Sequence, residues 1–597
     1  MQIGRHSRIL CGRRGRTSTD RYQRLHIEDA REGRNMTLTN TQISLRAATE
    51  VMTPEALARL QPTRLSFTRA LVNRMAREAW RIDRTEWAMD EHGNGRAQYR
   101  VRIGTHTFSF VIISNEPTME ARSPRIIGGA WDMLGALIDG DATDEQVEAT
   151  RREIGKLYAG RAAPDTLVWC RANRSLRAFD LAVDALAEGR QPDLGTLATI
   201  GYLFRNTGLD ANGTFGTRSF LAYPDDHPLR TPYFPQMLCA YLAREFSFDL
   251  ADHIAAARNP DASRLAPELK AYLGLGNGSG LGLVLWVHNH PHLLEAWLGL
   301  REQALAQARS LDPEQFTALR PRLAALLERT VTYFEQDCMV YEQFADSRSV
   351  ATDLRRARAE LDAVPDTDRP VEAYRSRLAE SVCAAAQESV NSLLIECLGE
   401  QIDTLLDGAI ASELAAADPG WPVAELAAVL RDEYAWALAI DLAAPGALNQ
   451  VWYKSRDAEE PRRGPVDEVP PQTVDLALAL PVLLQRLNAL LATTTAVTVG
   501  EFVAEHPDLR WIIERMQSLA GRRYHTPHAN VHDDAFVPAH LIRLMNVAIY
   551  GIDKTRDHLG RNLRGLMFHG APTREHLADA DSDWFWPVLP PGTEAAR

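Results

Sequence analysis

The spacing of apolar and polar residues divides the chain into a short N-terminal region with β character and a long helical remainder. Residues 62–80 repeat apolar side chains, among them Leu71 and Met75, at the spacing of an amphipathic helix. Over residues 80–114, three alternating runs follow, separated by the turn sequences EHGNG and GT. This pattern predicts a small antiparallel sheet of three strands near the N-terminus.

Beyond about residue 127, apolar positions recur almost entirely at the period of about 3.6 residues that is typical of helices. Helix starts carry suitable capping residues, with Asp312 before Pro313 and Thr498 three residues before Glu501. We therefore expect a mainly α, multi-helix globular protein that is α+β overall. The helices are expected near residues 130–138, 143–158, 165–189, 236–257, 281–309, 313–345, 371–413, 422–442, 473–492 and 498–519.

Charge and composition suggest four segments. Residues 1–34 hold nine Arg and four acidic residues, a net charge of +5. Because the whole chain has a net charge of −13, the remaining residues have a net charge of −18. The basic start is expected to be a disordered tail, or else translation starts at Met36 and not at Met1. The expected segments are a tail (1–35), a small α+β segment with the sheet (36–126), a helical domain with glycine-rich loops (127–370) and a helical C-terminal domain with a histidine-rich loop (371–597).

Several classes of partner and cofactor are disfavoured by composition. The acidic remainder should repel nucleic acid, and we find no apolar run of about 18 residues that could span a membrane. Six scattered cysteines without a C-x-x-C pair fit a reducing, cytoplasmic setting. Only four lysines occur, which disfavours pyridoxal phosphate chemistry, and there is no evidence for an NAD or FAD motif.

A glycine-rich stretch offers the clearest candidate for ligand binding. Residues 274–282 contain five glycines, and Pro291 fits the first position of a following helix. Glycines let backbone N–H groups converge, and the start of a helix favours an anion, so this stretch predicts a phosphate or carboxylate site. Its predicted ligand-binding residues are Gly278, Ser279, Gly280 and Asn289. The alternative is that the glycines allow close packing.

Part of this stretch, Gly278-Ser-Gly-Leu-Gly-Leu283, resembles the second glycine box of the histidine-kinase-type ATPases. The resemblance covers a handful of residues. The first box of that family reads Asp-x-Gly-x-Gly, whereas this chain has Asp210-Ala-Asn-Gly-Thr-Phe-Gly216, and no helical asparagine box is evident. We therefore rank ATPase activity below lyase or hydrolase activity.

Residues 204–220 form a second polar, glycine-containing stretch, which we expect to be a loop. Our first hypothesis is a cytoplasmic enzyme that acts on a small anionic molecule bound between this loop and residues 274–282. Arg205 would pair with the anion. Asn206 and Asn212 would orient it. The candidate proton-transfer residues are Asp210 and His290.

Two alternatives stay open. In the first, the protein is a non-catalytic helical binding or scaffold protein. In the second, it is an enzyme that depends on a divalent metal, because seven of the 17 histidines lie between residues 525 and 576. The candidate metal ligands are His525, His528, His532 and Asp533.

Overall fold

The computed structural model describes most of the chain from residue 45 onward. Its contacts separate Met1–Ser44 from Leu45–Arg597, and everything below concerns the second unit. The described residues are 45–53, 56–57, 59–118, 131–157, 166–211, 223–224, 226–231, 233–277, 291–336, 347–403, 405–406, 418–444, 480–524, 547–556, 563–579, 584 and 586–588.

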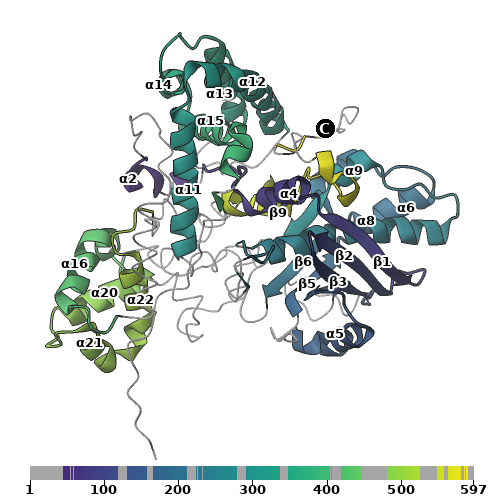
Figure 1. Cartoon of the computed structure of the whole chain (residues 1–597), viewed down its shortest axis with the longest axis horizontal. Coiled ribbons are helices and arrows are strands. Elements are labelled where there is room, and N and C mark those ends of the chain that lie inside the picture. The colour runs from purple at the N-terminus through teal and green to yellow at the C-terminus, as the bar shows by residue number, and fades with distance from the viewer. Residues whose placement is uncertain are drawn as a thin grey trace, which may run out of the picture. The chain divides into compact units, whose positions relative to one another are not determined.

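The sheet is much larger than the sequence pattern predicts. Within the described residues it has nine strands in the order β1-β2-β3-β4-β5-β6-β7-β9-β8, and it is curled and mixed (Figure 1). The prediction of a mainly helical protein with only a small N-terminal sheet is therefore wrong. The strands are β1 (Arg81–Met89), β2 (Gly95–Ile103), β3 (His106–Ser114), β4 (Met133–Asp139), β5 (Thr166–Arg174), β6 (Tyr202–Ala211), β7 (Gly274–Asn277), β8 (Asp553–Arg556) and β9 (Leu563–Met567).

The first three strands are where alternation along the sequence predicts them. They pair antiparallel in the expected hairpins, and helix α4 (Phe67–Arg77) precedes them as predicted; a shorter helix, α2 (Ala48–Val51), comes earlier in the chain. The prediction fails at β4, which we expected to be a helix. Its sequence, MLGALID, is buried at every position except the last, so both faces are apolar and no two-residue period is visible.

Strands β5 and β6 were missed for related reasons. The stretch expected to be one helix over 165–189 begins as β5 and becomes helical only at α6 (Phe179–Ala187), before α7 (Leu194–Ile200). Strand β6 occupies the start of the expected 204–220 loop, where glycine and asparagine resemble turn residues. Pairing with β5 on one side and β7 on the other satisfies its backbone groups, and this outweighs its weak strand propensity.

Helices cover both faces of the sheet. The long helix α8 (Phe234–Arg258) is buried along most of its length and packs against β4, β5, β6 and β7. Alternate residues of β3, such as Phe110, belong to this core, whereas Val111 packs against Val147 of α5 (Asp144–Leu157) on the opposite face (Figure 1). After α8, the short helix α9 (Pro267–Tyr272) leads directly into β7.

Two helical cores follow the sheet. The first packs α11 (Pro291–Arg309), α12 (Pro313–Glu335), α13 (Ser347–Asp362), α14 (Pro370–Ser381) and α15 (Ala384–Cys397), followed by η2 (Gly399–Ile402). The second packs α16 (Val423–Glu433), α17 (Ala435–Leu438), α20 (Leu480–Leu491), α21 (Val499–Glu505), η4 (Pro507–Leu509) and α22 (Arg510–Leu519). The last short helix is η5 (Arg574–Asp579).

The two predicted caps are confirmed. Asp312 forms a reciprocal capping box with Gln315 at the start of α12, and Thr498 forms one with Glu501 at the start of α21. Within the described ranges, no helix combines the length and the apolar character needed to cross a membrane.

Candidate functional site

The two stretches singled out in the sequence are neighbours in the sheet at their described ends. Strands β6 and β7 pair in parallel, with Arg205 opposite Gly276 and Asn206 opposite Asn277. All other strand pairs among the described residues are antiparallel. Because the strands are parallel, their carboxyl ends lie at the same edge of the sheet. Residues 212–222 and 278–290, which follow β6 and β7 in the sequence, are outside the described residues.

Strand geometry limits how the predicted residues of β6 can act together. Asn206 is buried and Arg205 is half-buried, and adjacent residues of a strand point to opposite faces. A small ligand on one face can therefore contact only alternate residues of β6. Asp210 also lies in β6, opposite Trp169 of β5.

The other predicted site residues lie outside the described residues, so their roles stay predictions. They are Asn212, Gly278, Ser279, Gly280, Asn289, His290, His525, His528, His532 and Asp533. Among the residues that the structure describes, no group of three or more His, Cys, Asp or Glu side chains could hold a metal ion.

The first two glycines of the glycine-rich stretch have a packing role. A Cβ atom at Gly274 would lie 2.7 Å from the carbonyl oxygen of Met567 and 3.2 Å from the backbone nitrogen of His569. A Cβ atom at Gly276 would lie 2.7 Å from the ring of Tyr202. At these two positions, glycine is needed for close approach of β7 to its neighbours.

Helix α11 begins at Pro291, as the sequence predicts, and a buried histidine occupies its first turn. His292 is 8% exposed, and its Nε2 atom has no hydrogen-bond partner among the residues that the structure describes. Burial lowers the pKa of His292, and the positive charges of Arg522 and Arg515 lower it further. The imidazole therefore lies in a desolvated and positively charged environment.

The two arginines come from the second helical core, whose helix α22 packs against α11. Arg515 is completely buried, which lowers its pKa to about 10, so it still carries its charge at neutral pH. Arg522 is more exposed and lies 3.8 Å from Glu295, the fifth residue of α11. Arg515, Arg522 and Glu295 together carry one excess positive charge.

A second polar cluster was not predicted from the sequence. Asp553 of β8 contacts both the Nδ1 atom of His569, just after β9, and the hydroxyl of Tyr333 on α12. The signal available beforehand was the concentration of histidines between residues 525 and 576, to which His569 belongs. The sequence spacing of Tyr333, Asp553 and His569 does not predict this contact, because the three residues come from separate segments of the chain.

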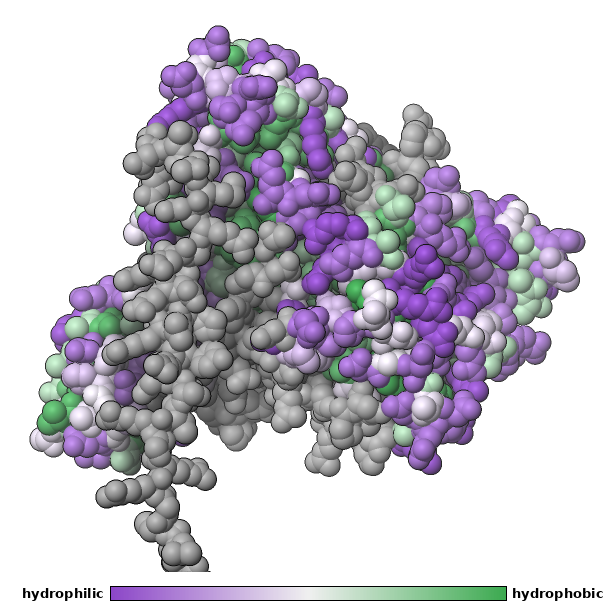
Figure 2. All heavy atoms as spheres, viewed as in Figure 1, coloured by the Kyte–Doolittle hydropathy of each residue, from purple (hydrophilic) through white to green (hydrophobic). Residues whose placement is uncertain are grey.

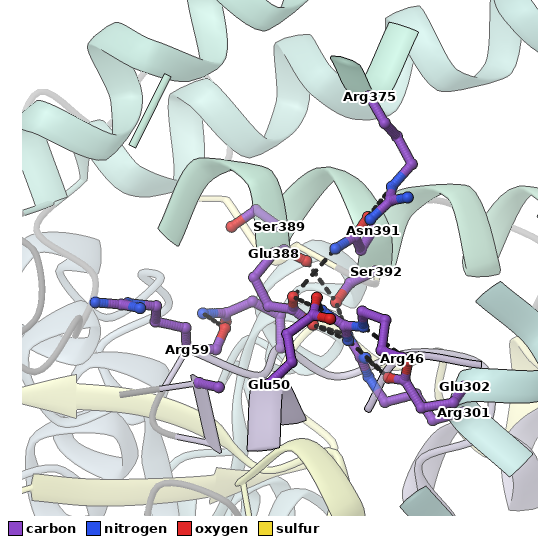
Figure 3. A network of polar contacts seen from close by, with 12 residues as sticks. Arg46, Glu50, Arg59, Arg301, Glu302, Arg375, Glu388, Ser389, Asn391 and Ser392 are labelled. Atoms are coloured by element: carbon purple, nitrogen blue, oxygen red, sulfur yellow. Dashed lines mark hydrogen bonds and ion pairs between the residues drawn. The ribbon is translucent and has the colours of Figure 1, made fainter. Parts of the chain in front are cut away.

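A buried ionic network around Arg46 and Arg301 is balanced in charge and has a structural role (Figure 3). Arg46 donates to Glu302 at 2.6 Å and to Glu388 at 3.0 Å, and Arg301 donates to the same two carboxylates. Burial alone would raise the pKa of Glu388, but Arg46 and Arg301 bring it well below its usual value. Two arginines and two glutamates thus join residue 46 to α11 and α15.

Comparisons with known proteins identify no relative: no protein-family model, no curated protein and no solved structure matches this chain. Any functional conclusion therefore depends on the residues and their geometry.

Proposed function

We propose that the chain is a cytoplasmic enzyme that binds a small phosphate- or carboxylate-bearing molecule at the start of α11. The observation that carries the proposal is the environment of His292. This side chain is buried, its Nε2 atom has no hydrogen-bond partner within the described part of the chain, and the positive charges of Arg515 and Arg522 act on it. A bound anion would supply the missing partner and the missing negative charge.

The start of a helix adds to this positive environment. The first N–H groups of α11 have no partners within the helix, and the aligned peptide dipoles place partial positive charge there. Pro291 has no N–H, so His292 and Leu293 are the first backbone donors of the helix. The charge of Glu295 offsets part of this positive charge, and one excess positive charge from Arg515, Arg522 and Glu295 remains to attract an anion.

The connection from β7 to α11 supports the same site. A strand, a glycine-rich segment and a helix start follow one another along the chain, which is an order that proteins use to hold anions with backbone N–H groups. Strands β6 and β7 are parallel, so both of their carboxyl ends lie at one edge of the sheet, and Arg205 in β6 is a further candidate contact.

The scaffold alternative receives less support from the described surface. A scaffold needs a continuous exposed apolar face. In Figure 2, apolar and hydrophilic residues intermix on the face shown. The large apolar side chains that are exposed among the described residues, Leu176, Val482 and Val497, lie apart in the sequence on the β5–α6 connection, α20 and the segment before α21.

Titration calorimetry with inorganic phosphate tests the proposal. We expect binding to the full chain that weakens about tenfold to a hundredfold in His292→Ala and in Arg522→Ala, because each removes a charge-assisted or buried hydrogen bond worth about 1.5–3 kcal/mol. Sodium chloride at matched ionic strength should produce no binding signal.

Arg510→Ala is the matched control. Arg510 begins α22 and forms an exposed ion pair with Glu514 at 2.8 Å, so its loss should leave phosphate affinity unchanged. Absence of binding to the wild type by phosphate and by a dicarboxylate such as succinate would contradict the proposal. Equal weakening by Arg510→Ala and Arg522→Ala would show a general charge effect and would contradict it as well.

A further inference from the structure

The turn that follows β9 has an unusual backbone. Phe568 has a φ angle of +57° and Gly570 has one of +80°, so His569 lies between two residues in the left-handed region. Glycine adopts this conformation freely, but a bulky residue such as Phe568 rarely does. Strained positions of this kind persist only where their surroundings fix them, and they are concentrated at functional sites.

A buried arginine fixes the segments on both sides of this turn. Arg244 of α8 is completely buried, and it donates to the carbonyl oxygens of Leu273 and Ala571, each at 2.7 Å. The hydroxyl of Tyr241 donates to the carbonyl oxygen of Pro572 at 2.9 Å. The central helix thus holds the start of β7 and the segment after His569 in one arrangement.

The turn also hydrogen-bonds directly to the residue at the end of α9. The backbone N–H of Gly570 donates to the carbonyl oxygen of Tyr272 at 3.2 Å. The ring of Tyr272 packs edge-on against the His569 imidazole, with 4.5 Å between ring centroids. These contacts leave the imidazole little freedom to rotate.

Within this frame, Asp553 orients the imidazole. One carboxylate oxygen contacts Nδ1 of His569, and the other accepts a hydrogen bond from the hydroxyl of Tyr333. A carboxylate can only accept, so Nδ1 carries a proton, and in the neutral imidazole the lone pair is on Nε2. The His569 side chain is 4% exposed, and its Nε2 atom is buried with no hydrogen-bond partner in the structure described.

A buried acceptor without a partner is uncommon in folded proteins, and a catalytic role is one of its established explanations. An oriented imidazole with a free lone pair is the arrangement that enzymes use to remove a proton. Asp553 occupies Nδ1, which leaves Nε2 as the reactive nitrogen of the ring.

We propose that His569 is a general base, positioned by Asp553, that activates a hydroxyl group of water or of a substrate alcohol. The proton moves from the O–H group to Nε2, and the electron pair of the broken bond stays on oxygen, which becomes the nucleophile. Asp553 stabilises the resulting imidazolium through Nδ1–H. The proton then passes from Nε2 to the leaving group or to solvent. This inference does not depend on the anion site at α11.

The competing interpretation is an ordinary buried histidine that only fills space. The two interpretations differ in whether the lone pair on Nε2 can be reached by a small molecule. The accessibility of Nε2 can be measured on the wild-type protein, so the test does not depend on whether a variant folds.

The experiment combines two measurements on the full chain at pH 7. In protein labelled with ¹⁵N-histidine, two-bond ¹H–¹⁵N spectra should show His569 as the Nδ1–H tautomer with an unprotonated Nε2, assigned by the loss of its signals in His569→Gln. Diethyl pyrocarbonate, which acylates neutral imidazole nitrogen, should modify His569, and mass spectrometry of the peptides locates the adduct.

His253 is the matched control, because Trp87 and the carbonyl oxygen of Asp90 occupy its two ring nitrogens at 3.2 and 2.9 Å. We expect His569 to be acylated faster than His253, and to lose most of that reactivity in Asp553→Asn, in which the other tautomer is favoured. A protonated Nε2, an unreactive His569 in the folded protein, or unchanged reactivity in Asp553→Asn would each overturn the proposal. None of these outcomes bears on phosphate binding, which variants at His292 and Arg522 test separately.

Discussion

The close approach of β7 to the end of β9 yields a quantitative prediction for Gly274→Ala. The new methyl carbon would lie 2.7 Å from the carbonyl oxygen of Met567 and 3.2 Å from the backbone nitrogen of His569. Both contacts are to backbone atoms, which cannot rotate away as a side chain can, so the two strands must separate locally. Overpacking of this kind costs about 1–3 kcal/mol.

A control substitution exists on α11. A Cβ atom at Gly299 meets no atom within 4 Å, so Gly299→Ala removes chain flexibility without a clash and should stabilise the protein by about 0.5–1 kcal/mol. The two alanines should therefore move stability in opposite directions, with a difference of about 1.5–4 kcal/mol. Gly276→Ala should be intermediate, because the atoms it meets belong to the Tyr202 ring, a side chain.

Hydrogen–deuterium exchange is the suitable assay, because a chain with several cores need not unfold in one step. In Gly274→Ala, backbone amides of β7 and β9 should exchange faster, while those of α20 in the separate helical core stay unchanged. Equal exchange in β9 for wild type, Gly274→Ala and Gly299→Ala would refute the packing explanation of this glycine.

Three further predictions follow. Arg46→Ala leaves the buried Glu302 and Glu388 with one arginine and should lower the free energy of unfolding by about 3–5 kcal/mol. The exposed control Arg510→Ala should lower it by less than about 1 kcal/mol. Equal hydrogen–deuterium exchange rates of α11 and α15 amides in the two variants would contradict this. Removal of residues 1–35 retains Arg46 and should leave the melting temperature unchanged, whereas a fall of several degrees would show that the tail is packed. The pKa of His292 is lowered below its usual 6.5 on folding, so the unfolded state takes up this proton first as pH falls. The neutral His292 side chain therefore contributes fully to stability above pH 6.5, and this contribution is lost as pH falls through the lowered pKa. His292→Gln should lose less stability on acidification, and a wild type and variant whose urea-unfolding free energies change in parallel with pH would contradict this.

The sequence was informative wherever one face of an element is buried and the other is solvated. Strands β1 to β3 and helix α4 show this alternation or repeat. Asp312 and Thr498 mark the starts of their helices because they cap them through local hydrogen bonds. The start of α11 at Pro291 was predicted for the same local reason.

The larger sheet could not be predicted because its signals are not local. Strand β4 is apolar on both faces, and β6 is stabilised by partners on both sides that come from other parts of the chain. Strands β8 and β9 join the sheet from more than 250 residues beyond β7 in the sequence, through pairs such as Leu275 with Met567. Pairing at that separation leaves no periodic trace in the sequence.

The candidate sites divide in the same way. The proposed anion site was suggested by a local feature, glycines before a helix start, although the arginines that act on His292, Arg515 and Arg522, were not predicted. Asp553 and His569 meet because β8 and β9 pair, and Tyr333 comes from a different core. Only the fold brings these three together.

Proton uptake on sulfate binding tests the central claim most directly. Sulfate is a divalent anion that does not titrate near neutral pH, and its charge beside His292 should raise the lowered pKa of that group, so binding should take up protons at a pH where the free protein holds His292 neutral. Calorimetric titrations in buffers of different ionisation enthalpy measure this uptake. We predict uptake of a fraction of one proton per chain by the wild type and none by His292→Gln at the same pH. Binding without proton uptake, or equal uptake in both proteins, would contradict an anion site at the start of α11.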